Sequence, residues 1–262
     1  MRTNGLREAW TEGRAALGAW LTIPSGFSAE IMAHAGFDWV CVDMQHGVID
    51  YQQMVAMLQA VSSTPVTPLV RVPWNEPGII GKTLDAGATG VIIPMVNTKA
   101  EAERAVWACR YAPMGGRSYG PLRANYYAGF DYFEHANDDV LCIVMIETRD
   151  AVARVDEILS VPGIDAVYVG PADLSITLGL PPAPDHDASS FTDAIARILE
   201  GCRTNRVVPG IAGNQKTAPK RVEQGFLLVE VASDARLLGV GAGEALHTVA
   251  PDGSASSRSA YL

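Results

Sequence analysis

Short apolar runs recur along this chain, and each is followed by a segment with the apolar spacing of a helix. Runs with so few polar residues form strands that are buried on both faces, as in a parallel sheet covered by helices. Eight such β-then-α units, at a spacing of about 30 residues, predict an α/β fold of one domain, the (β/α)8 TIM barrel. The expected strands are residues 18–23, 39–44, 68–72, 90–95, 140–146, 164–169, 207–212 and 226–232.

The segments between these runs divide into helices and two longer loops. Residues 111–132 are rich in Gly, Pro, Tyr and Arg and predict a long irregular loop, a kind of segment that is usually functional in a compact domain. A second polar loop is expected at 179–189, and the barrel domain at 1–250 with a disordered tail at 251–262. The expected helices are 25–35, 50–62, 77–85, 98–110, 149–160, 190–203, 217–224 and 233–249.

The charge and cysteine content exclude several classes of function. The 262-residue chain has a formal net charge of −9 and no cluster of Lys and Arg, which disfavours a nucleic-acid partner. A small anionic substrate would therefore need local positive charge from an arginine or a metal. The four cysteines form no CxxC motif, so we expect reduced thiols, no zinc finger and a cytoplasmic protein. No apolar stretch approaches the roughly 20 residues of a membrane span.

Two carboxylates, Glu147 and Asp173, follow the fifth and sixth expected strands. In a parallel barrel the carboxyl ends of the strands carry the chemistry, so the two side chains should lie at one mouth. Two carboxylates without a nearby Cys or second His suit a hard ion, Mg²⁺ or Mn²⁺, that keeps part of its water. The alternative is that both are solvent-facing acids at helix starts, where they favour the helix dipole.

His46 and Arg71 also stand at strand ends: His46 follows the second expected strand, and Arg71 is the next-to-last residue of the third. A histidine oriented by a carboxylate is a usable general base near neutral pH, and Asp43 or Asp85 could orient this one, although a lone histidine is more often structural. Arg71 would be a clamp for an anion or oxyanion, or else half of a salt bridge to a neighbouring strand-end acid.

The placement of lysine limits the type of carbon chemistry. Lys82, Lys99, Lys216 and Lys220 all fall in expected helices or loops, so no strand carries a desolvated lysine for a Schiff base. An enzyme of this kind that makes carbanions needs a metal as its electron sink. Glycine-rich phosphate-binding motifs of the P-loop or dinucleotide type are absent from the sequence.

With these residues in place, the chain resembles the HpcH/HpaI family of metal-dependent pyruvate aldolases. The matching phrases occur in the family's order and cover roughly residues 18–249. They are Val-Asp-Met-Gln-His-Gly (42–47), Val-Arg-Val-Pro (70–73), Leu-Asp-Ala-Gly-Ala (84–88), Ile-Ile-Pro-Met-Val (92–96), Cys-Arg-Tyr-Ala-Pro-Met-Gly-Gly-Arg (109–117), Ile-Glu-Thr (146–148) and Val-Gly-Pro-Ala-Asp-Leu (169–174).

The resemblance implies a barrel of the phosphoenolpyruvate/pyruvate type and a role for each site residue. Glu147 and Asp173 would bind Mg²⁺, Mn²⁺ or a similar ion such as Co²⁺, and pyruvate or hydroxypyruvate would chelate that ion. Asp43 would support the water shell of the metal. The remaining implied roles are enolate stabilisation by Arg71, proton transfer by His46 paired with Asp85, carboxylate binding by the backbone of Gly170 and Ala172, and an aldehyde pocket at Trp20, Arg123 and Ala212.

The resemblance implies that the enzyme cleaves 4-hydroxy-2-oxo acids to a 2-oxo acid and an aldehyde, or forms them from these two. It also implies a homo-oligomer, because members of the family are commonly hexamers whose subunits exchange their last helices. The alternatives are oxaloacetate decarboxylation, a citrate-lyase-like CoA-ester lyase, and a non-catalytic barrel that binds an oxo acid. Two positions depart from the family pattern: Gln45 stands where Glu is common, and Met145 where Gln is common.

Overall fold

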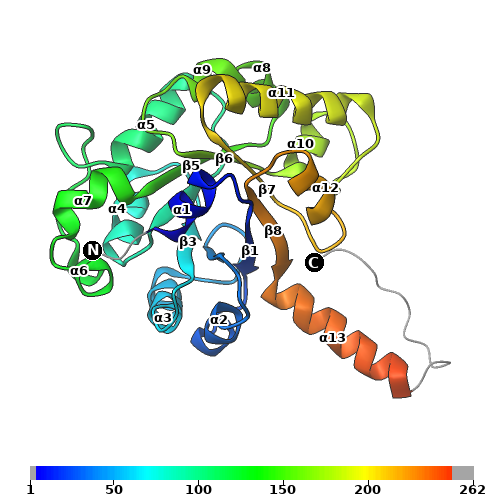
Figure 1. The fold of residues 1–262 in the computed structure, drawn as a ribbon, viewed down its shortest axis with the longest axis horizontal. Coiled ribbons are helices and arrows are strands. Elements are labelled where there is room, and N and C mark those ends of the chain that lie inside the picture. The colour runs from blue at the N-terminus through cyan, green and yellow to red at the C-terminus, as the bar shows by residue number, and fades with distance from the viewer. Residues whose placement is uncertain (1–3, 250–262) are drawn as a thin grey trace.

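The computed structural model describes residues 4–249, and its centre is a closed barrel of eight parallel strands in the order β1 to β8, with β8 pairing back to β1 (Figure 1). This confirms the expected TIM barrel. The tail at 251–262 lies outside the described residues. The strands are β1 (Ala16–Leu21), β2 (Trp39–Asp43), β3 (Thr67–Arg71), β4 (Gly90–Ile93), β5 (Leu141–Ile146), β6 (Ala166–Val169), β7 (Val208–Ile211) and β8 (Leu228–Ser233).

Helices surround the barrel, and several begin at side-chain caps that the sequence supplies. Ser25, Asp50 and Thr98 each accept a hydrogen bond from a backbone N–H in the first turn of the helix that they precede. The helices are α1 (Gly5–Thr11), α2 (Gly26–Ala33), α3 (Tyr51–Val61), α4 (Pro77–Asp85), α5 (Lys99–Cys109), α6 (Leu122–Ala128), α7 (Tyr132–Asp139), α8 (Arg149–Ala153), α9 (Val155–Leu159), α10 (Pro171–Thr177), α11 (Ser189–Asn205), α12 (Ala218–Glu223) and α13 (Asp234–Val249).

Continuous apolar strands produce two separate layers of core. Residues of β5 are all buried, with Ile143 and Met145 inside the barrel and Cys142, Val144 and Ile146 packed between the strands and the helices. Because both faces of a strand are apolar, the sequence shows no alternation, which is the signature of a parallel sheet covered by helices. All four cysteines are free, as expected, and all four are buried.

The structure corrects four expectations about local structure. Helix α1 precedes the barrel, where no helix was expected, and the long segment at 111–132 contains α6 and the start of α7. The expected helix at 149–160 is divided into α8 and α9 at Arg154. The Gly-Pro step after β6 starts α10 directly, with Pro171 in its first turn, where proline is tolerated because its missing N–H would have no partner there.

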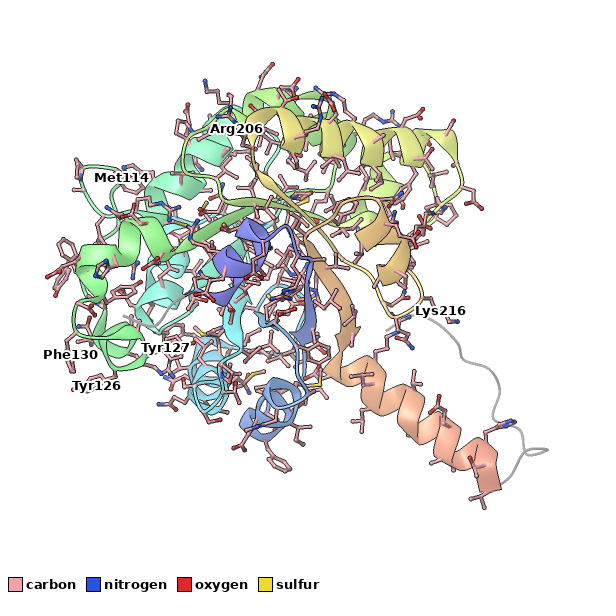
Figure 2. The ribbon with its side chains drawn as sticks, viewed as in Figure 1. Met114, Tyr126, Tyr127, Phe130, Arg206 and Lys216 are labelled. Carbon is pink, nitrogen blue, oxygen red and sulfur yellow. The ribbon has the colours of Figure 1, made fainter. Side chains whose placement is uncertain are left out.

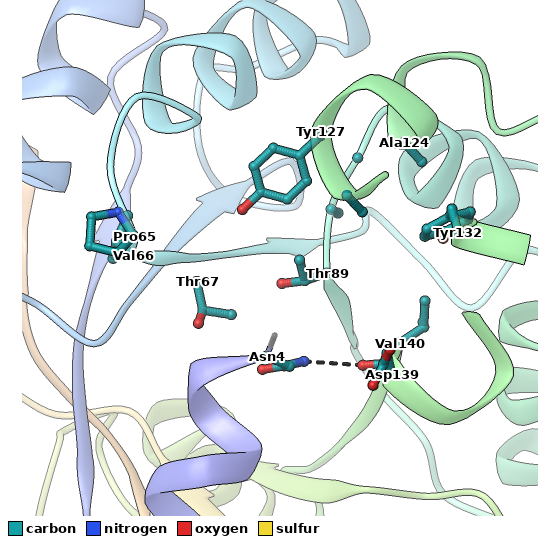
Figure 3. Close-up of a pocket in the computed structure, with 13 residues that line it drawn as sticks. Asn4, Pro65, Val66, Thr67, Thr89, Ala124, Tyr127, Tyr132, Asp139 and Val140 are labelled. Carbon is teal, nitrogen blue, oxygen red and sulfur yellow. Dashed lines mark hydrogen bonds between the residues drawn. The ribbon is translucent and has the colours of Figure 1, made fainter. Parts of the chain in front are cut away.

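The amino end of the barrel is closed. Leu6 and Ala9 of α1 pack into the interior cluster of the barrel, and in Figure 1 this helix lies across the middle of the ring of strands. A cavity remains beside α1, shown in Figure 3, where Asn4 donates a hydrogen bond to the backbone carbonyl of Asp139. Its volume is about 30 Å³, which is room for about one water molecule and not for a substrate.

Helix α13 projects away from the barrel (Figure 1). Its first residue, Asp234, is buried and accepts hydrogen bonds from Thr22 and Ser28, which fixes the helix to the β1–α2 loop and to α2. Beyond that anchor the helix exposes apolar side chains, among them Leu238, 67% exposed, and Val249, 86% exposed. Within residues 4–249, no helix has both the length and the apolarity of a membrane span.

Candidate active site

A cavity of about 270 Å³ opens at the carboxyl ends of the strands. Its size suits a small substrate, and its lining combines apolar side chains with a few polar groups, as in small-molecule sites generally. Nine of the predicted site residues line this cavity: Trp20, Asp43, His46, Arg71, Glu147, Gly170, Ala172, Asp173 and Ala212.

Glu147 directly follows β5 and is almost completely buried, 2% exposed. The backbone N–H of Met95 donates a hydrogen bond to its Oε1 at 2.8 Å. Its Oε2 occupies space beside Gly170, where an added Cβ would lie 2.4 Å from that oxygen. Burial, with a smaller contribution from the negative charge of Asp173, raises the pKa of Glu147 to about 7.

Asp173 lies in the first turn of α10, where its side chain is exposed to the cavity. Together, Asp173 and Glu147 place two mutually repelling carboxylates at one mouth, an arrangement that a cation relieves. No cluster of three or more His, Cys, Asp or Glu suited to a metal occurs in the described part of the chain. The donor set therefore fits a hard divalent ion that takes its other ligands from water and substrate.

Arg71 and Asp43 are directly opposite each other on β3 and β2. The guanidinium donates from Nε to Asp43 Oδ1 at 2.9 Å and from Nη2 to Oδ2 at 2.6 Å, so the salt bridge that the sequence left open is present. Its plane lies over the ring of Trp20, 4.3 Å from the centroid. A guanidinium has five N–H donors, so this pair leaves donors for an anionic ligand.

His46 lies in the turn that follows β2, and Asp43 shapes that turn through the backbone. Oδ1 of Asp43 accepts hydrogen bonds from the backbone N–H groups of Gln45 at 3.0 Å and His46 at 3.2 Å. Gly47 completes the turn, because an added Cβ there would lie 2.2 Å from the carbonyl oxygen of Asp43. Asp43 therefore orients His46 by fixing its main chain.

The expected pair of His46 and Asp85 is not formed within one chain. His46 follows the carboxyl end of β2, whereas Asp85 ends α4, just before the amino end of β4. The Asp85 carboxylate is instead ion-paired with Arg117, whose Nη2 donates to Oδ1 at 2.7 Å. The physical reason is that helices of this fold return the chain to the opposite end of the barrel.

Arg123 is also absent from the residues that line the cavity. Its guanidinium donates to the carbonyl oxygens of Leu58 and Ala86 and to the hydroxyl of Ser62, near the carboxyl ends of α3 and α4. This is the same end of the molecule as Asp85. Within one chain Arg123 therefore caps helices and does not reach the aldehyde pocket.

The sequence reasoning missed four polar residues that line the cavity: Thr22, Tyr168, Glu230 and Ser233. The hydroxyl oxygen of Tyr168 accepts a hydrogen bond from Nε1 of Trp20 at 2.9 Å. Burial raises the pKa of Glu230 to about 8, against the opposing effect of a hydrogen bond from the backbone N–H of Gly213. The signal in the sequence was a single carboxylate inside the apolar run at 226–232.

The lysines lie as expected. Lys82, Lys99 and Lys220 are helical, and Lys216 lies on the loop before α12 (Figure 2), so no strand in the part of the chain described carries a lysine. The residues of the cavity therefore provide carboxylates, an arginine and a histidine, and no amine for a Schiff base.

Comparison with known proteins places this site in a family. The family model for HpcH/HpaI aldolase/citrate lyase matches residues 17–239. A hydroxypyruvate/pyruvate aldolase of Rhizorhabdus wittichii is 42% identical over 240 residues, which cover 91% of this chain and 96% of the relative. A 4-hydroxy-2-oxo-heptane-1,7-dioate aldolase of Salmonella dublin is 41% identical over 243 residues, 91% of this chain and 92% of the relative.

A solved structure also matches the fold of this chain. The crystal structure of a family protein from Burkholderia cenocepacia superimposes with a TM-score of 0.88 at 33% identity, covering 94% of this chain and 99% of that chain. The sequence match, the barrel and the residues gathered at its mouth lead to one conclusion: the chain belongs to the HpcH/HpaI aldolase/citrate lyase family.

Proposed function

We propose that this protein is a carbon–carbon lyase, a metal-dependent aldolase that cleaves and forms 4-hydroxy-2-oxo acids from pyruvate or hydroxypyruvate and an aldehyde. The observation that carries the proposal is the convergence of Glu147, Asp173, Arg71 and His46 on one small cavity. The two relatives above are named as aldolases with these substrates, which supports the same reaction class here.

Glu147 and Asp173 would hold the metal ion, Mg²⁺ or Mn²⁺ with Co²⁺ possible as a substitute. When bound, the ion would supply positive charge beside the carboxylate and the 2-oxo group of the substrate. The backbone at Gly170 and Ala172 lines the cavity next to both acids and would receive the substrate carboxylate. Asp43, 2% exposed, would support the water around the ion, and its carboxylate also holds Arg71.

In the cleavage direction the C3–C4 bond breaks, and its electron pair becomes the C2=C3 bond of the pyruvate enolate. Arg71 stabilises the negative charge that develops on the 2-oxo oxygen. His46 takes the proton of the 4-hydroxyl group as that carbon becomes the aldehyde. The enolate carbon then takes up a proton to give pyruvate, and the aldehyde leaves past Trp20 and Ala212.

We further propose a homo-oligomer, a hexamer by resemblance to the family. The exposed apolar side chains of α13 support this, because a helix without a protein neighbour would not keep such a face in water. Around α6, Tyr126 and Phe130 are also exposed, 82% and 79%, and lie at the outer edge of the molecule (Figure 2). Pairing of Asp85 with His46, and contact of Arg123 with an aldehyde, would then occur only between two copies of the chain.

The decisive experiment is metal removal and replacement. Cleavage of a panel of 4-hydroxy-2-oxo acids is measured as the release of pyruvate or hydroxypyruvate. We expect EDTA to abolish this cleavage and Mn²⁺ to restore it. Full turnover after chelation would contradict the metal assignment. Binding of pyruvate without turnover of any substrate would instead indicate a non-catalytic barrel. Turnover of oxaloacetate alone would indicate a decarboxylase that forms the same enolate.

A further inference from the structure

Glu230 is a carboxyl group in the active-site cavity to which the reaction above gives no role. It lies on β8 between Leu228, which faces the interior cluster, and Ser233, which also lines the cavity. Its Oε2 accepts the hydrogen bond of the Gly213 backbone N–H at 3.1 Å. Its side chain is partly exposed, so the carboxyl is open to the cavity as well as supported by the protein.

A β-bulge turns this part of β8 toward the cavity. Gly18 of β1 pairs with Glu230, but the next residue, Ala19, pairs with Ala232, so one residue of β8 is extra. Val231 and Ala232 both pack against the outer core, and Glu230 and Ser233 therefore both face inward although they are three residues apart. Bulges commonly re-aim side chains beside active sites.

The position of β8 in the barrel assigns Glu230 to the aldehyde. Glu147 follows β5, and Asp173 lies just after β6. In the closed barrel β1 lies across from β5, and β8 lies across from β4. An aldehyde that approaches a 2-oxo acid bound at Glu147 and Asp173 from across the barrel would contact the wall formed by β7, β8 and β1. We call this wall the acceptor wall; its residues in the cavity are Trp20, Tyr168 of the adjoining β6, Ala212, Glu230 and Ser233.

The acceptor wall carries polar groups that an apolar aldehyde would not need. The Tyr168 hydroxyl receives a hydrogen bond from Trp20, which leaves its own O–H proton for an acceptor in the cavity. Burial raises the pKa of this tyrosine, and the charge of Glu230 raises it further, so the two groups lie close enough to interact. Ala212 also lines the cavity and contributes little volume to this wall.

We propose that Glu230 is a specificity-determining residue whose carboxyl binds the hydroxyl group on the carbon next to the aldehyde carbon of the acceptor. The substrate class is then the α-hydroxyaldehydes, and in the cleavage direction the 4,5-dihydroxy-2-oxo acids. A site built to hydrogen-bond a substrate hydroxyl discriminates against the analogue that lacks it, because its own polar groups are then left without partners. This inference rests on the proposed aldolase function.

The test compares two acceptors of equal size, glycolaldehyde and propanal, in the addition of pyruvate with the full-length protein and Mn²⁺. We expect E230A to lower kcat/KM for glycolaldehyde about tenfold and for propanal less than about twofold, the size of one lost hydrogen bond. E230Q keeps a hydrogen-bonding group of the same shape and should retain most of the preference. E223A, on the exposed face of the nearby α12, is the matched control and should leave both values unchanged.

Other outcomes have definite meanings. Equal losses for both aldehydes in E230A would overturn the inference and leave Glu230 with the structural task of holding Gly213. A loss that appears with hydroxypyruvate and not with pyruvate, whichever aldehyde is used, would move the contact to the donor and also overturn it. Exchange of the methyl protons of pyruvate with deuterium needs no aldehyde, so it should be equal in wild type and E230A; its absence in the wild type would contradict the proposed function itself.

Discussion

Asp43 and Arg71 form a two-pronged salt bridge across neighbouring strands, at 2.9 Å and 2.6 Å, and the same carboxylate fixes the turn that carries His46. One carboxylate thus positions both the cation expected to stabilise the enolate and the group expected to move the proton. Because Asp43 is 2% exposed, this contact is shielded from water. The attraction between two charges is stronger in such a buried position than at the surface.

D43N should therefore weaken catalysis without replacing any group that reacts. We expect kcat/KM for aldol cleavage to fall by about 10²-fold, because Arg71 and His46 lose their positions together. The free energy of unfolding should fall by roughly 2–4 kcal/mol, since Arg71 is left without its buried partner. Enzyme assays and urea unfolding measure the two effects.

The matched control is D38N, which alters an ion pair with Arg14 whose side chains are 28% and 50% exposed. Surface pairs contribute about 0–1 kcal/mol, so this variant should be close to wild type in both measurements. If D43N kept wild-type activity, the positioning role of Asp43 would be wrong.

E147Q should lose metal binding while it keeps the fold. In metal-free protein the pKa of Glu147 is raised to about 7, so at pH 8 its buried charge is destabilising, and the neutral variant should melt at the same or a higher temperature. Saturating Mn²⁺ should raise the melting temperature of wild type by several degrees. It should not change that of E147Q; an equal shift in both proteins would mean that the ion binds elsewhere.

H46A should separate two reactions of the same enolate. Aldol cleavage needs the 4-hydroxyl deprotonated and should fall by about 10²–10⁴-fold, whereas oxaloacetate decarboxylation involves no such proton and should fall much less. Parallel assays of both reactions on one preparation measure the difference. Losses of the same size would remove His46 from the proton-transfer step.

Subunit mixing tests the origin of the partner of His46. If Asp85 reaches His46 of another copy, H46A and D85N should each be impaired, and unfolding and refolding them together in equal amounts should restore about a quarter of the wild-type activity by random assembly. H46A mixed with R71A should restore none, because His46 and Arg71 line the same cavity of one chain. No recovery in the first mixture would contradict an Asp85 contribution between copies.

The raised pKa of Glu230 should make the free energy of unfolding depend on pH. Its pKa is raised to about 8 from an ordinary value of 4.5, so between these values the folded protein binds more protons than the unfolded one, and stability falls as the pH rises through that window. E230Q lacks this loss. The difference in melting temperature between E230Q and wild type, measured without metal, should therefore increase from pH 5 to pH 9. A constant difference would show that Glu230 stays ionised in the folded state.

The barrel was predictable because each buried strand is an apolar run long enough to stand out, and the strand ends came within about two residues. Glu147, Arg71 and Asp173 were found because each lies at or just after the end of such a run: Arg71 ends β3, Glu147 directly follows β5, and Asp173 follows β6 in the first turn of α10. The separation of Asp85 from His46 within one chain could not be predicted, because sequence order does not reveal that a helix has carried the chain back to the other end of the barrel. Glu230 was missed because one polar residue in a strand gives no sign of which way a bulge will turn it.

Gly170 has a consequence for any attempt to engineer this enzyme. Its missing methyl group is the space into which the carboxylate of Glu147 fits, 2.4 Å from where a Cβ would stand. The residue has no side chain, yet even alanine would compete for space with Glu147, which follows a different strand and is the proposed metal ligand. A substitution at Gly170 would therefore have to displace the carboxylate of Glu147, and libraries that aim to change substrate preference should diversify Met145 and the acceptor wall instead.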